Sequence, residues 1–402
     1  MNGKWPIKRL GELSDLITKG TTPTTVGHTF ISFGVNFIKV ESISENGEFI
    51  EDKLSYISDD CHKTFRRSQL KCGDILFSIA GALGRTALVT EKIIPANINQ
   101  ALAIIRLKPS DDVLPAFVLR ALATGFVLEQ IEKFKGGVAQ QNLSLAQVQE
   151  FQIPIPPIPE QRRIVGFLDE AFDCIATAKA NAEKNLQSAR ALFDSHLQSI
   201  INQCGEGWKQ KTLEEIATNF GRGKSRHRPR NEPKLYGGKY PFIQTGDIRN
   251  SDHLITEFSQ TYNEAGLAQS KLWPKGTICI TIAANIAETG ILDFDACFPD
   301  SVIGVVANPE EADIDYVEYL LQAFKVRIQA MGKGSAQANI NMGTFENERF
   351  PFPLVSEQRK VVYELNALRE ETRRLESIYQ QKLAALDELK RSLLDKAFTG
   401  KL

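Results

Sequence analysis

The chain has 402 residues, with 48 Lys and Arg against 49 Asp and Glu and a formal net charge of -1. This length gives room for two or three domains, which excludes a small disulfide-stapled scaffold, and the balanced charge offers no global attraction to nucleic acid or an anionic membrane. Six cysteines without a C-x-x-C pair, no signal-peptide pattern and no apolar run near membrane-span length predict reduced thiols in a soluble cytoplasmic protein.

The first 157 residues carry signals for both helices and strands. The positions of Leu10, Leu13, Leu16 and Ile17 fit one helix face, whereas the short apolar runs 36–40, 75–79 and 102–107 predict strands. An amphipathic helix is predicted over 113–134. The proline-spaced segment 151–159 must be extended, because proline excludes the α region for the residue before it. We therefore expect a mixed α/β domain over 1–157 that ends in a stiff strap.

A long helix is predicted next, from about Glu160 to Asn202 within a spacer segment 158–204. Its apolar residues recur on average every 3.6 positions from Ile164 to Ile200 and form one unbroken stripe. At 1.5 Å per residue such a helix is about 60 Å long, more than one globular domain needs. The stripe residues that we assign to a helix seam or a partner surface are Ile164, Leu168, Ile175, Leu186 and Phe193.

The remainder of the chain repeats this order. Trp5 reappears as Trp208, an offset of 203 that later settles at 197, where Glu160-Gln161 answers Glu357-Gln358. The repeat predicts a second α/β domain over 205–355, with strands near positions 240, 278 and 302, a helix over 314–330 and an extended strap at 350–353. A second spacer helix over 356–402 follows, with seam residues Leu365, Leu375, Leu383, Leu386 and Leu394.

The order of the chain predicts how these parts are arranged. Two apolar stripes are most simply buried against each other, and the second helix has to return because the second domain restarts directly after the first helix. We expect two similar α/β domains separated by an antiparallel, coiled-coil-like rod with a pseudo-two-fold axis. In the alternative arrangement each helix packs on its own globular part.

Signatures of catalysis are missing from the sequence. The segment Gly223-Lys224-Ser225 looks like the end of a phosphate-binding loop, but position 218, where that motif needs glycine, is Thr218. The five histidines lack paired spacing with carboxylates. We predict no catalytic residue, no metal and no cofactor bound by this chain.

Signals for binding are stronger. Seven cations fall within 18 residues of the second copy, in a segment whose Gly221, Gly223 and Pro229 predict a loop: Arg222, Lys224, Arg226, Arg228, Arg230, Lys234 and Lys239. Such cations suit phosphates and guanine edges. The alternative is an exposed charge run without a partner, because residues 205–356 carry 16 Lys and Arg against 19 Asp and Glu.

The same place in the first copy holds different side chains, namely Lys19, Thr21, Thr22 and Thr24, as expected if each copy reads a different DNA target. Further candidate DNA-binding residues are Arg66, Arg67, Arg85 and Gln244. The amides of Gln140, Gln141, Gln337 and Asn339 are candidate adenine readers or, equally, turn residues.

Several short motifs follow one another in a fixed order along the chain, and the order in the first copy is repeated in the second. They comprise Gly73-Asp74-Ile75-Leu76-Phe77-Ser78 with Gly81 and Gly84, Gln141-Asn142-Leu143-Ser144, the strap before Glu160-Gln161-Arg162-Arg163, Glu357-Gln358-Arg359-Lys360, and the ending Leu394-Asp395-Lys396-Ala397-Phe398-Thr399-Gly400. Over its whole length the chain resembles the specificity (DNA-recognition) subunits of type I restriction-modification systems. The second copy departs from the pattern at Asn285, Ala287 and 339–341.

The resemblance implies a non-catalytic subunit with two target-recognition domains, each of which reads one half of a bipartite duplex DNA target. The helices would set the gap between the halves and dock two methyltransferase subunits, which carry S-adenosylmethionine, and a restriction and translocation subunit would join them. The alternatives are a specificity subunit of a modification-only complex, a DNA methyltransferase with its own recognition domains, and a coiled-coil adaptor. A methyltransferase should show a cofactor loop, which the sequence lacks.

Overall fold

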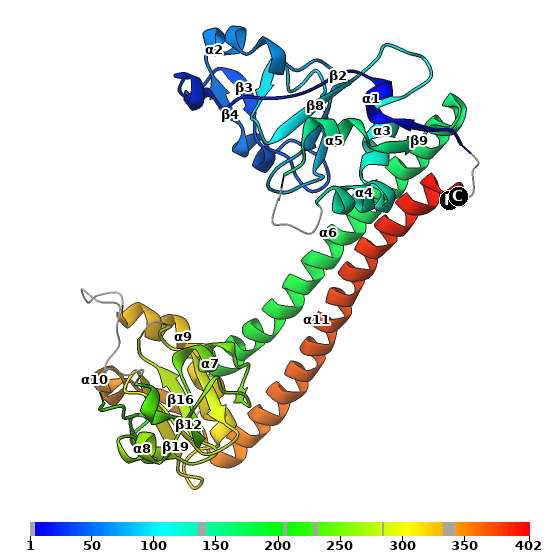
Figure 1. Cartoon of the computed structure of the whole chain (residues 1–402). Helices are drawn as coiled ribbons and strands as arrows, with labels where there is room; N and C mark the ends of the chain where they lie inside the picture. The colour runs from blue at the N-terminus through cyan, green and yellow to red at the C-terminus, as the bar shows by residue number, and fades with distance from the viewer. Residues whose placement is uncertain (1–4, 136–141, 204–206, 228–231, 284, 333–341) are drawn as a thin grey trace. The chain divides into compact units, whose positions relative to one another are not determined.

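The structure, a computed structural model, describes residues 5–135, 142–203, 207–227, 232–283, 285–332 and 342–402. It consists of two compact units, unit 1 with residues 1–183 and 381–402, and unit 2 with residues 184–380 (Figure 1). Both units combine helices and sheets, which confirms the mixed α/β class. Each unit also contains a part of both long helices, so the first and last residues of the chain belong to the same unit.

Unit 1 contains three small sheets. Its strands are β1 (Ile7–Arg9), β2 (Ser14–Lys19), β3 (Val35–Ile38), β4 (Ser55–Ile57), β5 (Ile75–Ser78), β6 (Thr86–Leu88), β7 (Ala96–Ile98), β8 (Leu102–Leu107) and β9 (Gln152–Pro154). Its shorter helices are α1 (Leu10–Leu13), α2 (Asp59–Thr64), α3 (Pro115–Leu122), α4 (Gly125–Lys135) and α5 (Leu145–Gln149). The sheet orders are β2-β8-β5-β6, β4-β3-β7 and β1-β9. The three strands predicted from apolar runs are confirmed.

The central strands of unit 1 are buried on both faces. Successive side chains of a strand point to opposite faces, so Ile75 and Phe77 of β5 join the core beneath the helices, while Leu76 joins a second core with Ile38 and Ile98. All of them are fully buried. This double covering explains why these strands are continuous apolar runs and not alternating patterns.

Unit 2 has the same organisation. Its strands are β10 (Lys209–Lys211), β11 (Ala217–Arg222), β12 (Tyr236–Phe242), β13 (Leu254–Ile255), β14 (Gln260–Tyr262), β15 (Leu272–Trp273), β16 (Ile278–Thr281), β17 (Thr289–Leu292), β18 (Ala296–Cys297), β19 (Val302–Ala307) and β20 (Phe350–Phe352). Its shorter helices are α7 (Thr245–Asn250), α8 (Glu264–Ala268), α9 (Ile314–Gly332) and α10 (Met342–Asn347). The sheet orders are β11-β19-β16-β17-β13, β14-β12-β18-β15 and β10-β20. The strands near 240, 278 and 302 and the helix over 314–330 are confirmed.

Two helix predictions in unit 1 are wrong in detail. The helix expected through Ile17 ends at Leu13, and Leu16 and Ile17 lie in β2, which pairs antiparallel with β8. The helix expected over 113–134 is divided into α3 and α4, and Ala123 and Thr124 separate them. Pairing with a distant strand in the first case, and a local break before Gly125 in the second, outweigh the helical periodicity.

Both predicted straps contain an extended strand, which pairs with the strand that opens its own globular part, but the prediction is wrong for 158–159, where the first long helix has already begun. Strand β9 pairs with β1, and β20 pairs with β10, both antiparallel. The long helices α6 (Ile158–Asn202) and α11 (Val355–Phe398) begin a few residues later. Within the described part of the chain, no helix combines the length and apolar character needed to cross a membrane.

A buried glutamine fixes the start of each long helix. In unit 1 the Gln161 amide accepts from the Leu114 N–H at 2.9 Å and donates to the carbonyls of Asp112 and Pro156, both at 2.8 Å. In unit 2 the Gln358 amide makes the equivalent three bonds. Both glutamines are fully buried, so each one ties the strap, the first helical turn and the globular part together.

The long helices run antiparallel within each unit. In unit 1, Lys179 of α6 pairs with Asp387 of α11 at 2.7 Å, and Lys390 of α11 lies over the ring of Phe172 of α6. The residue with the higher number on α6 thus contacts the residue with the lower number on α11. In unit 2, Arg190 pairs with Glu376 and His196 with Glu364 in the same sense. The two packing arrangements expected as alternatives occur together, because Ile164 and Leu168 share one core with Phe117 of α3 and Leu394 of α11.

Candidate nucleic-acid interface

The basic segment of unit 2 is more ordered than the predicted loop. Arg222 is the last residue of β11, Lys234 lies in a 3-10 turn and Lys239 lies in β12, so the loop prediction is wrong at these three positions. Pairing with the neighbouring strands β19 and β14 extends the backbone at Arg222 and in β12. Lys239 also faces Glu264 at 3.8 Å, which balances its charge locally.

Residues 222–226 alternate between exposed and buried. Arg222, Lys224 and Arg226 are exposed, whereas Gly223 and Ser225 are buried. In an extended chain alternate side chains point to the same side, roughly 6.6 Å apart at 3.3 Å per residue. The segment therefore presents three cations in a row, which we call the basic row.

The backbone of the basic row is held from beneath. The Gly223 N–H donates to the Val302 carbonyl at 2.9 Å, and a Cβ at this glycine would lie 2.2 Å from the Phe298 carbonyl oxygen. The His227 N–H donates to Oε1 of Gln269 at 3.0 Å. Only glycine permits the close approach to the Phe298 carbonyl, so Gly223 holds the backbone of the row in this position.

Lys271 joins this surface although the sequence pattern did not single it out. Its ammonium lies 3.5 Å from the centroid of the Trp273 ring and donates to Oδ1 of Asn219 at 3.0 Å. Burial lowers the pKa of Lys271, and the charge of nearby Lys224 lowers it further. An isolated lysine 45 residues after the basic row carries no local signal, so only the fold brings Lys271 to it.

The first unit places its hydroxyl-rich segment in the same position. Lys19 ends β2 as Arg222 ends β11, and a Cβ at Gly20 would lie 1.8 Å from the Ile98 carbonyl oxygen, which repeats the close approach seen at Gly223. Lys19 and Thr24 are exposed, and Thr21 and Thr22 are half-buried. The Thr22 hydroxyl donates to Oε1 of Gln100, a polar residue that the sequence analysis missed.

The other candidate residues have mixed surroundings. Arg66 and Arg67 are exposed, and the Arg67 guanidinium reaches the Thr18 hydroxyl at 3.1 Å, beside Lys19. The Arg85 guanidinium donates to the Ile43 carbonyl at 2.8 Å and so braces a loop of its own unit, and the Gln244 side chain donates to Gln260 at 2.6 Å. The candidates that lie outside the described residues are Gln140, Gln141, Arg228, Arg230, Gln337 and Asn339.

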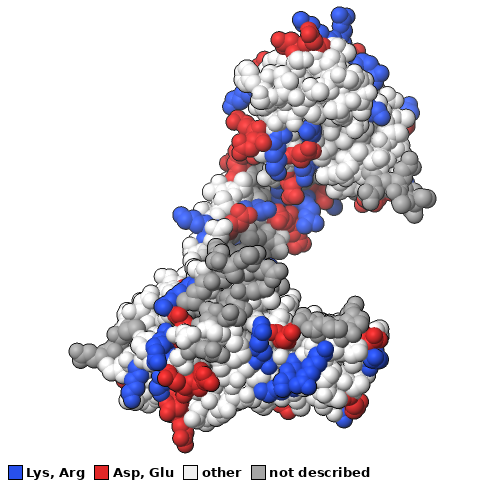
Figure 2. Space-filling model, turned by 90° about the vertical axis from the view of Figure 1, so that its left-hand side faces the viewer, with Lys and Arg blue, Asp and Glu red and all other residues white. Residues whose placement is uncertain are grey.

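Charge on the surface is local and mixed. Figure 2 shows blue and red groups interspersed over the visible face, with one compact blue patch on unit 2, in keeping with the net charge of -1. Within the described segments, no group of three or more His, Cys, Asp or Glu side chains is arranged to hold a metal ion. The two units thus share one backbone arrangement at this site and differ in the side chains that they expose there.

Comparison with known proteins identifies the family. A family model described as the type I restriction modification DNA specificity domain matches twice, over residues 2–187 and 205–384. The chain belongs to this family. The MjaX specificity subunit of Methanocaldococcus jannaschii is 24% identical over 419 residues, which cover 99% of this chain and 93% of that relative. The EcoBI specificity subunit of Escherichia coli is 30% identical over 179 residues, 44% of this chain and 36% of that protein.

Solved structures share the fold of this specificity subunit. A structure from work on complex assembly and conformational transition of the type I R-M system has a TM-score of 0.83 at 20% identity and covers 100% of this chain and 99% of that one. The HsdS subunit from Thermoanaerobacter tengcongensis has a TM-score of 0.62 at 18% identity, with coverages of 100% and 98%. Family membership confirms the resemblance and makes this chain a non-catalytic specificity subunit.

A motif loop of the specificity subunit keeps its geometry where the second copy departs from the pattern. Gly84 has a φ of 80°, and Ala287 at the matching position has a φ of 60°, an unusual conformation for alanine. The Gly84 N–H donates to the Ser78 carbonyl at 3.1 Å and the Ala287 N–H to the Thr281 carbonyl at 2.8 Å. The departure in sequence therefore changes the side chain and leaves the turn intact.

The predicted helix seam of the specificity subunit is covered along both helices. Six of the ten assigned residues are buried and the remaining four are half-buried. The buried six are Ile164, Leu168, Ile175, Phe193, Leu365 and Leu394, and the half-buried four are Leu186, Leu375, Leu383 and Leu386. No member of the set is exposed, as expected for stripes that face another element.

Proposed function

We propose that this specificity subunit binds duplex DNA in a type I restriction-modification complex and that each unit reads one half of a bipartite target. The observation that carries this proposal is the contrast between the two segments that follow β2 and β11. Their backbones match, down to the close approaches of Gly20 and Gly223, while their exposed side chains differ. Two readers on one scaffold with different contact residues suit a target with two different halves.

The proposed contacts differ in kind between the units. In unit 2 the basic row and Lys271 supply phosphate contacts and candidate bidentate contacts to guanine. In unit 1 the hydroxyls of Thr21, Thr22 and Thr24 beside Lys19 supply weaker hydrogen-bonding groups, which suits readout of base edges with less charge neutralisation. The long helices α6 and α11 set the gap between the halves and dock two methyltransferase subunits.

The cofactor of the proposed complex would lie on its partners. S-adenosylmethionine is expected on the methyltransferase subunits, and a restriction and translocation subunit completes the complex. A modification-only complex would use the specificity subunit in the same way and would lack the last partner. Co-expression with neighbouring genes, followed by purification, distinguishes these two assemblies.

A domain exchange tests the proposal. Residues 207–350 are replaced by the matching segment of a relative with a known target, the hybrid is expressed with its methyltransferase subunits, and the methylated motif is sequenced. The expected result is a hybrid target in which one half has changed and the other is intact. A motif with both halves changed, or with neither changed, contradicts the proposal.

The basic row permits a finer test. Alanine at a base-contacting member should cost about 1–3 kcal/mol and relax specificity in one half of the target. Alanine at a member that contacts only phosphate should weaken binding to all sequences and reduce the salt dependence. Lys275, which pairs with Asp293 at 2.6 Å, is a matched control whose replacement should change neither.

A further inference from the structure

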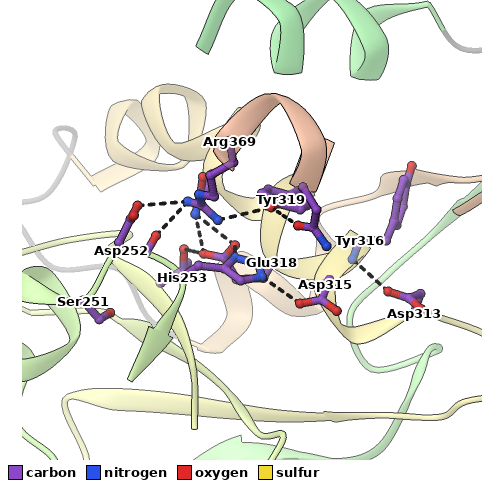
Figure 3. Close-up of polar contacts among 12 residues, drawn as sticks. Ser251, Asp252, His253, Asp313, Asp315, Tyr316, Glu318, Tyr319 and Arg369 are labelled. Carbon is purple, nitrogen blue, oxygen red and sulfur yellow. Dashed lines mark hydrogen bonds and ion pairs between the residues drawn. The ribbon is translucent and has the colours of Figure 1, made fainter. Parts of the chain in front are cut away.

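Unit 2 contains a joint in which α9, α11 and α6 meet through charged and aromatic side chains (Figure 3). Arg369 of α11 is 8% exposed and lies over both the Tyr319 ring on α9 and the Phe193 ring on α6, at 5.1 Å from each centroid, and these two rings contact each other with their centroids 5.9 Å apart. Its guanidinium also donates to the Asp252 carbonyl oxygen at 2.8 Å. Arg369 therefore joins both long helices to the globular part of unit 2.

His253 lies directly beneath this arginine. Its Nδ1 is 2.5 Å from a Glu318 carboxylate oxygen, its Nε2 is 2.7 Å from a carboxylate oxygen of Asp315, and its ring stacks on Tyr319 at 4.7 Å. An ionised carboxylate can only accept, and a neutral imidazole has a single N–H to donate. Both bonds are satisfied together only when His253 is an imidazolium.

Glu318 makes this charge necessary. The side chain of Glu318 is fully buried, and the other side chains that donate to it are Thr289 at 2.9 Å and the amide of Gln322 at 2.7 Å. Of these three donors only His253 can carry a positive charge. A buried carboxylate without a compensating charge is strongly unfavourable, so the joint depends on the proton of His253.

The surroundings of His253 favour the protonated form overall. Burial by itself lowers the pKa of His253, and so does the charge of Arg369. The hydrogen bonds that His253 donates to Asp315 and Glu318, together with the charge of Glu318, outweigh both, so the pKa is raised. The neighbouring Asp252 stays anionic, because burial, which raises its pKa, is outweighed by the hydrogen bond and charge of Arg373 and the charge of Arg369.

A cavity gives solvent access to this cluster. It has a volume of about 860 Å³ and is lined by His253, Asp315, Arg369, Glu370 and Arg373, among others. The charged groups around His253 thus come from the segment before β13, from α9 and from α11. Protons can exchange with water without unfolding of the unit.

Unit 1 has the same joint with the roles of cation and aromatic exchanged. Phe172, 197 positions before Arg369, has Arg120 over its ring at 5.0 Å and Lys390 at 5.1 Å, and Lys390 stands 197 positions after Phe193. Arg120 donates to Asp169 at 2.7 Å, where unit 2 has Tyr319 donating to Asn366. The cations of this joint are an arginine and a lysine, residue types whose ordinary pKa values lie well above that of histidine, although burial lowers the pKa of Lys390.

We propose that His253 is a positioning residue of unit 2, whose imidazolium ties α9 and the segment before β13 to α11, and that this joint loosens in unit 2 alone when His253 loses its proton. Strand β13 forms one edge of the five-stranded sheet, and β11, which carries Arg222, forms the other. A loosened joint therefore frees the sheet that presents the basic row. The inference rests on unit 2 itself and not on DNA binding.

The sign of the pH dependence follows from the raised pKa. A histidine whose pKa is higher in the folded state stabilises that state fully below its unfolded pKa, and the stabilisation is lost as the pH rises through the folded value. With one proton coupled to the joint, its opening equilibrium should rise by at most about tenfold for each pH unit between the unfolded and the folded pKa of His253, and level off above the folded pKa. The joint of unit 1 should not change in this range.

Two measurements on the full chain test this. Imidazole nitrogen NMR with histidine labelling should show His253 keeping both N–H groups to a higher pH than an ordinary histidine. Hydrogen exchange, corrected for the intrinsic pH effect, should accelerate in residues 251–255 and α9 as the pH rises through the titration midpoint of His253 and then level off, with no such acceleration in α3 of unit 1. Titration of His253 in the range of an ordinary histidine, or equal acceleration in both units, would overturn the proposal.

Matched variants separate positioning from general stability. His253→Gln should abolish the alkaline acceleration, whereas His196→Gln, at an exposed pair with Glu364, should retain it. Glu318→Gln keeps the shape of the side chain and removes its charge, so the NMR midpoint of His253 should fall towards that of an ordinary histidine. A His253→Gln protein with the full pH response, or an unchanged midpoint in Glu318→Gln, refutes the joint even if DNA binding by unit 2 is confirmed.

Discussion

The buried glutamine at the start of α11 offers a quantitative test of how the helix is attached to unit 2. Replacing Gln358 by Leu keeps the approximate volume and removes three hydrogen bonds, one accepted from Asp313 N–H at 2.8 Å and two donated to the carbonyls of Glu311 and Pro353 at 3.2 and 2.9 Å. Each buried group left without a partner costs about 1–3 kcal/mol. Taking the lower value for each, we expect a loss of about 3 kcal/mol.

Such a loss is large against the total stability of a domain, about 5–15 kcal/mol. Urea unfolding followed by tryptophan fluorescence measures it, because Trp273 is fully buried in unit 2. The midpoint should fall with the slope unchanged. Lys360→Leu, an exposed position on the first turns of the same helix, is the control and should stay within about 0.5 kcal/mol.

The repeat supplies an independent replicate in unit 1. Gln161→Leu removes the equivalent three bonds and should cost a similar amount, measured by hydrogen exchange in the first turns of α6. If Gln358→Leu costs no more than Lys360→Leu, the glutamine does not anchor the helix. The shared Glu-Gln motif would then need a different explanation.

Three further predictions follow from the packing. Leu375→Asp or Leu386→Asp should cost several kcal/mol of stability and prevent co-purification with methyltransferase subunits. Leu389→Asp on the same helix, at a side chain 45% exposed, is the control and should do neither. Equal behaviour of the three variants would refute the assignment of Leu375 and Leu386 to a buried helix seam. Gly84→Ala should lower the free energy of unfolding in urea by about 1–2 kcal/mol through backbone strain, because φ at Gly84 is 80°. Steric contact adds little, since the nearest atoms beyond the adjacent residues lie 3.6 Å or more from the added carbon. An unchanged free energy of unfolding would contradict the assigned backbone conformation. Asp395→Ala removes the acceptor for the Gly125 N–H at 3.0 Å and should cost about 1 kcal/mol, with faster hydrogen exchange confined to the first turn of α4.

The sequence by itself determined the features that depend on local periodicity. The duplication, the two long helices and the extended straps all follow from spacing, because a helical stripe or a proline constrains its own neighbours whatever the rest of the chain does. The close approaches at Gly20 and Gly223 agree with this, since only glycine tolerates them and both stand at the same place in the repeat. The exposed row Arg222, Lys224 and Arg226 was likewise visible as a local charge run.

The tertiary structure decided what depends on residues far apart in the chain. Leu16 and Ile17 form a strand because β8, some 90 residues later, supplies the hydrogen bonds, and this pairing outweighs their helical spacing. Lys271 lies near Lys224 of the basic row although it follows it by 47 positions, and His253 contacts Glu318, which follows it by 65 positions. Such encounters leave no periodic signal, because the energy of a buried charge pair depends on distance in space and on exclusion of water, and neither is encoded by separation along the chain.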